Sequence, residues 1–276
     1  MLRRPHTIIT PGRGWGAEEL AEVWRFRSLF VRFAMRDITL RYRQTLLGVV
    51  WVVAQPLLAA GVFALVFGKV AGLSSGNVPY VVFSYAGLLC WTFFSGTVAK
   101  ASGSLLGNAA LVSKVYFPRL LIPLSTLASG LIDFGVSLAL MVVLLVIYGV
   151  APGLAVLALP VWLLLTVLLA SGVGLLLSGL VVRYRDVSYV LPVVIQFLLY
   201  ASPVAYALGT VPHSVRIYFL INPLTGLLEA FRWSLLGNGV PLMLGELVYS
   251  SVTAVALFGL GLYVFTRIER TFADVI

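Results

Sequence analysis

Charged residues are scarce in this sequence. Asp, Glu, Lys and Arg make up 11% of its 276 residues, whereas apolar residues make up 61%. A soluble domain carries about a quarter charged residues, so this composition excludes a disordered chain and argues against a soluble globular one. The single cysteine, Cys90, cannot form a disulfide within the chain, and we expect it to be buried. The composition therefore predicts a polytopic membrane protein, since six helices of about 20 residues each fit this length.

Catalytic motifs are also missing. The sequence contains no GxxxxGK(S/T), HExxH or GxSxG, and no cluster of His with carboxylates, so we expect neither P-loop ATP hydrolysis nor a metal site in this chain. Only Asp133 and Glu246 lie in or near hydrophobic segments, and two carboxylates are few for a proton or sodium relay. An integral glycosyltransferase would need a carboxylate pair at a membrane face, but Asp37 and Asp186 each have arginines beside them. The chain is therefore expected to be a channel, a secondary transporter, or one component of a machine that another subunit powers.

The basic residues are concentrated at the start of the chain. The formal net charge is +9, and nine of the 19 Lys and Arg residues precede residue 46. This asymmetry is the positive-inside signature of a cytoplasmic N-terminus before a first span, and it also suits contact with anionic lipid headgroups. We favour these two explanations of the basic N-terminal segment over nucleic-acid binding.

Hydrophobic periodicity divides the chain into three parts. Residues 1–17 are rich in Gly and Pro and read as irregular. Residues 18–45 show an apolar stripe with a helical period and predict an amphipathic helix lying in the membrane interface. Residues 46–276 predict a six-span all-α domain with spans at 46–67, 79–99, 124–148, 154–178, 187–208 and 247–265. With both termini cytoplasmic, 16 Lys and Arg lie inside and three outside, which supports this topology.

The connection between the last two spans, 209–246, is long and mostly apolar. Because Pro212, Pro223 and Pro241 interrupt it, it cannot be one span. Two short re-entrant helices around Asn222-Pro223 would explain it, provided that protein or a water-filled cavity covers them. The alternative is an amphipathic loop on the membrane surface.

Four motifs resemble those of a transporter family. They are RDITLRYRQTLLG at 36–48 with Trp51 and Gln55-Pro56 following, SKVYFPR at 113–119, RYRDV at 183–187, and NPL at 222–224 followed by EAFRW at 229–233. In this order they resemble the type-2 ABC exporter permeases, and more narrowly the polysaccharide-export branch, which moves O-antigen, capsule and teichoic acid chains. The resemblance runs from about residue 25 to the C-terminus.

The resemblance implies a homodimer of six-span subunits in the bacterial cytoplasmic (inner) membrane. Two cytosolic P-loop ATPase subunits would bind ATP and Mg²⁺, so this chain needs no cofactor of its own, and the substrate would be a lipid-linked polysaccharide. A type-2 exporter of lipids or drugs is the alternative within the family. From outside the family, a channel or secondary transporter would need no ATPase.

The resemblance also implies roles for cytoplasmic residues. A coupling helix would contact the ATPase through Asn108, Ser113, Lys114, Tyr116 and Arg119, with a second contact at Arg183, Arg185 and Asp186. An ordinary basic loop is the alternative. At the end of the interfacial helix, a gate for the pyrophosphate of the lipid-linked substrate would comprise Arg36, Asp37, Arg41 and Arg43, since Arg pairs well with phosphate. Simple anchoring to headgroups is the alternative there.

Aromatic and outer residues complete the candidate set. Sugar rings stack on aromatic faces, so the candidates for a channel lining are Trp51, Phe63, Tyr80, Tyr85, Trp91, Phe197 and Tyr200; interfacial belts or core packing would also explain them. An external gate would comprise Asn222, Glu229, Arg232 and Trp233, in which Glu229 and Arg232 pair three residues apart, unless they form a surface ion pair. Asp133 must find a partner within the protein.

Overall fold

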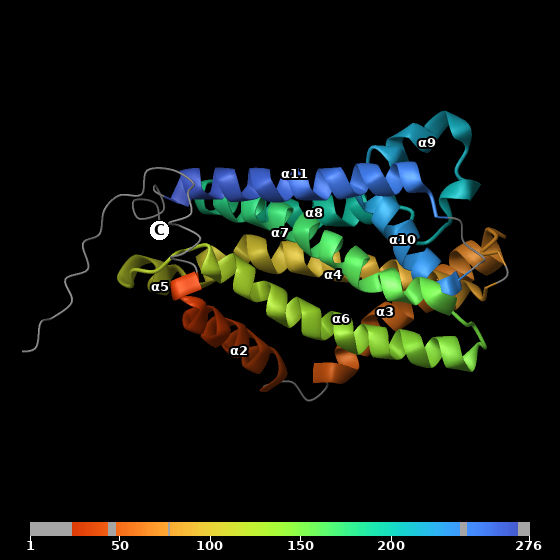
Figure 1. Cartoon of the computed structure of the whole chain (residues 1–276), viewed down its shortest axis with the longest axis horizontal. Helices are drawn as coiled ribbons and strands as arrows, with labels where there is room; N and C mark the ends of the chain where they lie inside the picture. The colour runs from red at the N-terminus through yellow and green to blue at the C-terminus, as the bar shows by residue number, and fades with distance from the viewer. Residues whose placement is uncertain (1–23, 44–47, 77, 238–241, 270–276) are drawn as a thin grey trace, which may run out of the picture.

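The computed structural model describes residues 24–43, 48–76, 78–237 and 242–269, and over these residues it is a bundle of long helices without a strand (Figure 1). The irregular segment predicted at 1–17 lies outside the described residues. Of the helix predicted at 18–45, the structure contains α2 (Arg27–Arg43), which runs obliquely beside α6. The all-α fold class predicted from composition is confirmed for the described part of the chain.

Five helical segments are long and apolar enough to cross a membrane. The first runs through α3 (Gly48–Phe63) and continues as the π-helix η1 (Ala64–Val70). The others are α4 (Tyr80–Gly107), α6 (Leu121–Ile147), the 3₁₀-helix η2 (Gly153–Ala158) followed by α7 (Leu159–Arg183), and α11 (Leu244–Glu269). Each corresponds to one of the six predicted spans.

The remaining predicted span, 187–208, is not one continuous helix. α8 (Val187–Tyr200) has 14 residues, or about 21 Å at 1.5 Å per residue, which is less than the roughly 30 Å of a hydrocarbon core. The helix ends because Pro203 follows it; proline has no N–H to donate and disfavours a helical conformation in the residue before it. The helical part of this segment is therefore shorter than the predicted span, which Pro192 and Pro203 interrupt.

The connection between α8 and α11 forms two short helices, as the sequence predicts. α9 (His213–Leu220) and α10 (Leu224–Leu236) flank Asn222-Pro223 at the end of the bundle opposite to α5 (Ala109–Lys114) (Figure 1). Every residue of α10 except Trp233 is buried. A loop lying on the membrane surface therefore does not describe α10, which packs inside the bundle against α4 and α11.

α4 is the central helix. In its most apolar stretch 78% of the residues are buried, compared with 11–33% in the other four segments, and Cys90 is buried on this helix as expected. α7 packs beside α4, and α11 packs on α7, where two glycines allow a close approach. A Cβ on Gly172 would lie 2.6 Å from the backbone of Leu257, and a Cβ on Gly261 would overlap the carbonyl of Gly172. Small residues at a helix–helix contact permit this close approach.

Candidate functional site

The predicted coupling segment contains a short helix at one end of the bundle (Figure 1). α5 follows α4 directly, and Asn108 joins the two helices. The Asn108 side chain donates to a carbonyl of α4 at 2.8 Å, and Ser113 Oγ donates to a carbonyl of α5 at 3.0 Å. Lys114 and Tyr116 are exposed. The helix expected here is confirmed, and Lys114 and Tyr116 are its accessible candidates for contact with a partner.

Arg119, at the end of the same segment, is held by the last turn of α11. Its backbone N–H donates to Glu269 Oε1 at 2.9 Å, and its Nη1 donates to the Glu269 carbonyl oxygen at 2.6 Å. These bonds fix the chain after α5 to a residue 150 positions further on. Sequence reasoning missed Glu269, because no local spacing connects the end of α11 with Arg119.

The second predicted cytoplasmic contact lies where α7 ends and α8 begins. Arg183, Arg185 and Asp186 are all exposed. The Arg183 guanidinium lies 5.4 Å from the centre of the Tyr184 ring. α6 leads away from α5 and α7 returns, so this turn and α5 share one end of the bundle (Figure 1). The structure thus brings the two candidate coupling groups to the same end.

The predicted gate residues of α2 separate into different environments. Arg36 pairs with its neighbour Asp37 at 2.8 Å and lies over the ring of Phe33, 5.2 Å from its centre. Arg41 instead reaches α6 and pairs with Asp133 at 3.0 Å. Arg43 is the last residue of α2, and its side chain is outside the described part of the chain. Of the three gate candidates whose side chains are described, Arg36 and Asp37 therefore pair with each other, whereas Arg41 pairs with α6.

An apolar contact anchors α2 to the segment after α5. Phe33 and Phe117 are both buried, and their ring centres lie 5.5 Å apart. They belong to a small core that also includes Leu105 of α4 and Phe265 of α11. The helix that carries the candidate gate is thus packed against the chain that follows the candidate coupling helix.

Asp133 has the partners within the protein that its position requires. Lys100 Nζ on α4 and Arg41 Nη1 on α2 lie 2.9 Å and 3.0 Å from the same oxygen, Oδ2 of Asp133. Lys100 also donates to Ser129 Oγ at 3.2 Å. Lys100 was expected in a cytoplasmic loop, but α4 continues beyond it to Gly107. These charged side chains therefore connect α2, α4 and α6.

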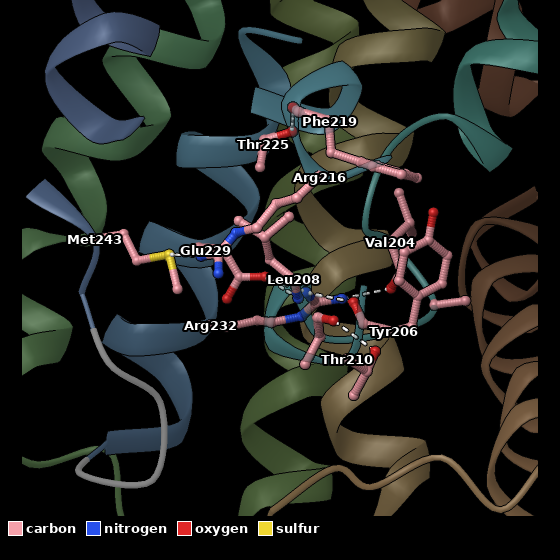
Figure 2. A network of polar contacts seen from close by, with 12 residues as sticks. Val204, Tyr206, Leu208, Thr210, Arg216, Phe219, Thr225, Glu229, Arg232 and Met243 are labelled. Carbon is pink, nitrogen blue, oxygen red and sulfur yellow. Dashed lines mark hydrogen bonds and ion pairs between the residues drawn. The ribbon is translucent and has the colours of Figure 1, made fainter. Parts of the chain in front are cut away.

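The predicted external gate contains a buried ion pair (Figure 2). Arg232 Nη1 lies 3.0 Å from Glu229 Oε1, which confirms the predicted pairing. The side chains are 0% and 7% exposed, so the surface ion pair that the sequence left open is wrong. Burial lowers the pKa of the Arg232 guanidinium, and the Glu229 carboxylate opposes that shift.

Arg232 also binds the irregular chain that follows α8. Its Nη2 donates to the Val204 carbonyl at 2.6 Å and its Nη1 to the Tyr206 carbonyl at 3.2 Å, as Figure 2 shows. The guanidinium lies 4.1 Å from the centre of the Phe83 ring. These contacts supply donors to carbonyls that the broken helix leaves without helical partners.

Asn222 and Trp233 differ in their surroundings. The Asn222 side chain donates to Ser202 Oγ at 2.8 Å and accepts the Leu224 N–H at 3.0 Å, which holds the turn between α9 and α10. Trp233 is the one residue of α10 that is not buried. Three of the four outer candidates thus stabilise the packing of this region.

The aromatic candidates also divide into two groups. Tyr85 and Trp91 are buried in the core of α4, and Tyr85 Oη donates to the Ser137 carbonyl at 3.0 Å. Core packing, the alternative left open by the sequence, accounts for these two. Trp51, Phe197 and Tyr200 are 58%, 70% and 59% exposed. Phe63 and Tyr80 are half-buried, and Tyr80 donates to the Ala205 carbonyl at 2.7 Å.

Comparison with known proteins places these features in a family. Residues 28–236 match the family described as ABC-2 type transporter. The chain is 28% identical over 249 residues to the O-antigen export system permease protein RfbA of Klebsiella pneumoniae, covering 90% of this chain and 95% of that protein. It is 30% identical over 213 residues to the protein of the same name from Myxococcus xanthus, covering 76% and 81% respectively.

A polysialic acid transport protein is similar too. The polysialic acid transport protein KpsM of Escherichia coli is 24% identical over 235 residues, covering 83% of this chain and 90% of that protein. Since the family match spans most of the sequence and includes α2 to α10, this chain belongs to the ABC-2 type transporter family.

Proposed function

We propose that this chain is the membrane subunit of an ATP-driven exporter that moves a lipid-linked polysaccharide across the bacterial cytoplasmic membrane. The observation that carries the proposal is the similarity, over 90% of the chain, to a permease named for O-antigen export. The sequence contains no P-loop motif, so ATP hydrolysis would take place in a separate cytosolic subunit.

The proposed topology has six crossings with both termini in the cytoplasm. α8, although short, would make the fifth crossing together with the irregular chain up to residue 208. Arg232 supports this arrangement, because it satisfies carbonyls of that irregular chain inside the protein, as non-helical backbone at membrane depth requires. α9 and α10 would then be the outer re-entrant helices, and α2 would lie along the inner interface.

We further propose that the working unit is a homodimer. α8 has large apolar side chains that are more than half exposed, at Tyr189, Val190, Phe197 and Tyr200 among others. α3 likewise exposes Trp51 and Leu58. Two copies of the chain would supply facing aromatic surfaces, over which a sugar polymer could pass without a grip on one particular linkage.

Coupling to the ATPase would occur through α5 and the turn at 183–186. Support comes from their place at one end of the bundle and from the exposure of Lys114 and Arg185. Substituting Lys114→Glu reverses one exposed charge without removing a buried contact, so we expect unchanged thermal stability and weaker ATPase binding. Unchanged subunit stoichiometry after purification of this variant would contradict the coupling role.

Deletion of the gene in the source bacterium tests the proposed function. We expect the surface glycan to be lost and its lipid-linked precursor to accumulate at the inner face of the membrane. Reintroduction of the chain should restore export, measured as glycan that a membrane-impermeant lectin can label in intact cells. Normal surface labelling in the deletion strain, without accumulation of precursor, would contradict the function.

A further inference from the structure

The buried apolar side chains form two separate cores. The larger one extends from the middle of the bundle to α10 and includes Phe134 of α6 and Phe231 of α10. The smaller one lies at the end of the bundle that carries α5 and includes Phe33, Phe117 and Phe265 (Figure 1). The chain is therefore packed around two centres, named here the large core and the small core.

A layer of small residues separates the two cores in α4, α6, α7 and α11. Among the described residues, every buried position of these helices between the two cores holds a residue no larger than threonine. The buried positions are Ala101, Ser102 and Ser104 on α4, Ser125, Thr126, Ser129 and Gly130 on α6, Ser171, Gly172 and Gly174 on α7, and Gly261 on α11. This layer lacks the interdigitated large side chains that fix the packing of each core.

The helices approach one another closely in this layer. A Cβ on Gly174 of α7 would lie 2.7 Å from the Cβ of Ala101 on α4. On its other side, α7 meets α11 at Gly172 and Gly261, where an added Cβ would overlap backbone atoms. Small residues permit such close crossings, and larger side chains pack the helices apart on both sides. The layer is therefore a place where the helices cross, with one core on each side.

The hydroxyl groups of the layer bond to their own helices. Ser102 Oγ of α4 donates to the carbonyl three residues earlier at 2.9 Å, and Ser125 and Thr126 of α6 do the same at 2.8 Å and 2.7 Å. Bonds of this kind compete with the backbone hydrogen bonds and often bend a helix. Glycine together with serine is also a common place for a kink. The layer is thus the level at which these helices bend most readily.

The small core holds together segments that lie far apart in the sequence. Val112 of α5 and Val182 at the end of α7 are both buried in it, beside the two candidate coupling groups. Phe33 attaches α2 to the same core, because its ring packs on that of Phe117 at 5.5 Å. The hydrogen bonds between the segment after α5 and the last turn of α11 join these two parts as well. One core therefore connects α2, α5 and the ends of α7 and α11.

Charged contacts connect α2 to the other side of the layer. Asp133, just beyond the layer on α6, contacts Lys100 of α4 at 2.9 Å and Arg41 of α2 at 3.0 Å. Salt bridges at interfaces that rotate break and form again with other partners. These contacts therefore hold α2 in its present position without the interlocked packing that would prevent it from moving.

We propose that the small core and the segments attached to it move as one unit, with the small-residue layer as the hinge. Hinges are formed by a few residues that absorb a change in backbone angles, and small residues do this readily. Since α5 and α2 belong to the same unit, a partner that displaces α5 would shift α2 relative to the large core. That this partner is an ATPase rests on the proposed function, whereas the unit and its hinge are properties of this chain alone.

Hydrogen exchange of the full chain in lipid nanodiscs, followed by mass spectrometry, tests the unit. Phe117→Ala and Phe134→Ala are a matched pair, because both phenylalanines are 5% exposed and they lie in different cores. We expect Phe117→Ala to accelerate exchange about tenfold or more in α2, in the segment after α5 and in the last turns of α11 together. Exchange in α10 should stay unchanged, and Phe134→Ala should give the reverse pattern.

Two outcomes of this experiment would overturn the proposal. Exchange that rises as much in α10 as in α2 would show that the two cores open together. Exchange that rises only next to residue 117 in the sequence would show that the small core does not join its segments. If Phe117→Ala does not fold, Phe117→Leu keeps most of the apolar volume, and the same pattern is expected with a smaller acceleration.

Distances between spin labels test the hinge. In a Cys90→Ala background, labels at the exposed Val31 and Leu180 measure the inside of the unit, and labels at Val31 and Leu157 measure its position relative to the other end of the bundle. Dilution with unlabelled chain leaves one labelled copy in a nanodisc. We expect a broader distance distribution for the second pair than for the first.

Removal of hydroxyl groups from the layer should stiffen the hinge. Ser102→Ala with Ser125→Ala removes two bonds that compete with the helix backbone and leaves the layer small. We expect the distribution between Val31 and Leu157 to become narrower, and the one between Val31 and Leu180 to stay the same. Equal widths for the two pairs, or no response to the double variant, would overturn the hinge. Both measurements use this chain alone, so a failure of the surface-glycan assay would leave their results unaffected.

Discussion

Substituting Arg232→Met tests the interpretation of the buried ion pair. Methionine keeps most of the apolar volume but removes the guanidinium that bonds Glu229, Val204 and Tyr206 at 3.0 Å, 2.6 Å and 3.2 Å. The Glu229 carboxylate, whose side chain is 7% exposed, would be left without its cation. Breaking a buried pair in this way destabilises a protein by about 3–5 kcal/mol. The loss of the hydrogen bonds to the two carbonyls destabilises it further.

The expected loss of stability is large enough to measure by thermal unfolding in detergent. At about 2–4 °C per kcal/mol for a chain of this size, the melting temperature should fall by roughly 6–20 °C. Arg216→Met on α9 is the matched control, since Arg216 is only half-buried and its guanidinium contacts Met243 Sδ at 3.5 Å. We expect a shift near zero for this variant. A shift below about 2 °C for Arg232→Met would refute the reasoning.

A double variant separates charge from packing. Adding Glu229→Gln to Arg232→Met replaces the unpaired carboxylate with a neutral amide, which is less unfavourable to bury. We therefore expect the double variant to regain part of the melting temperature lost in Arg232→Met. If the double variant is less stable than the single one, the dominant loss lies in packing rather than in the unpaired charge.

Two further substitutions test other parts of the structure. Gly261→Val should separate α7 from α11, because the valine side chain would overlap the Gly172 carbonyl. We expect a strong loss of monodisperse protein in size-exclusion chromatography. Gly259→Val is the control and should give a normal yield, because a Cβ at that position meets nothing within 4 Å. Glu269→Ala removes the carboxylate that accepts the Arg119 N–H. We expect the segment after α5 to become more mobile and less ATPase partner to be recovered with the purified chain. Recovery equal to that of the parent would show that this contact does not position the segment.

Local patterns predicted the elements of this fold well. The long apolar segments, the helix after Asn108 and the pair of helices around Asn222-Pro223 all follow from hydropathy and from proline positions. The Glu229–Arg232 pair was predictable because three residues span about one helical turn. Its burial was not, since it depends on α4 and α11 covering α10, and these helices lie far away in the sequence.

Tertiary contacts account for most of what the sequence could not predict. Asp133 requires a partner by its position alone, but its partners are 33 residues away on α4 and 92 residues away on α2. Arg41 and Arg36 share a motif and a helix, yet only Arg41 reaches α6. Pro203 marks the end of α8 in the sequence, whereas hydropathy defines only an apolar segment up to 208 and does not tell which part of it is helical.

The most direct test of the central claim is to identify what the chain binds in its native membrane. The tagged chain would be purified in mild detergent, and its partners identified and counted by mass. We predict a P-loop ATPase at one copy per copy of this chain. A lone oligomer without any nucleotide-binding partner would contradict the account and would favour a channel or a secondary transporter.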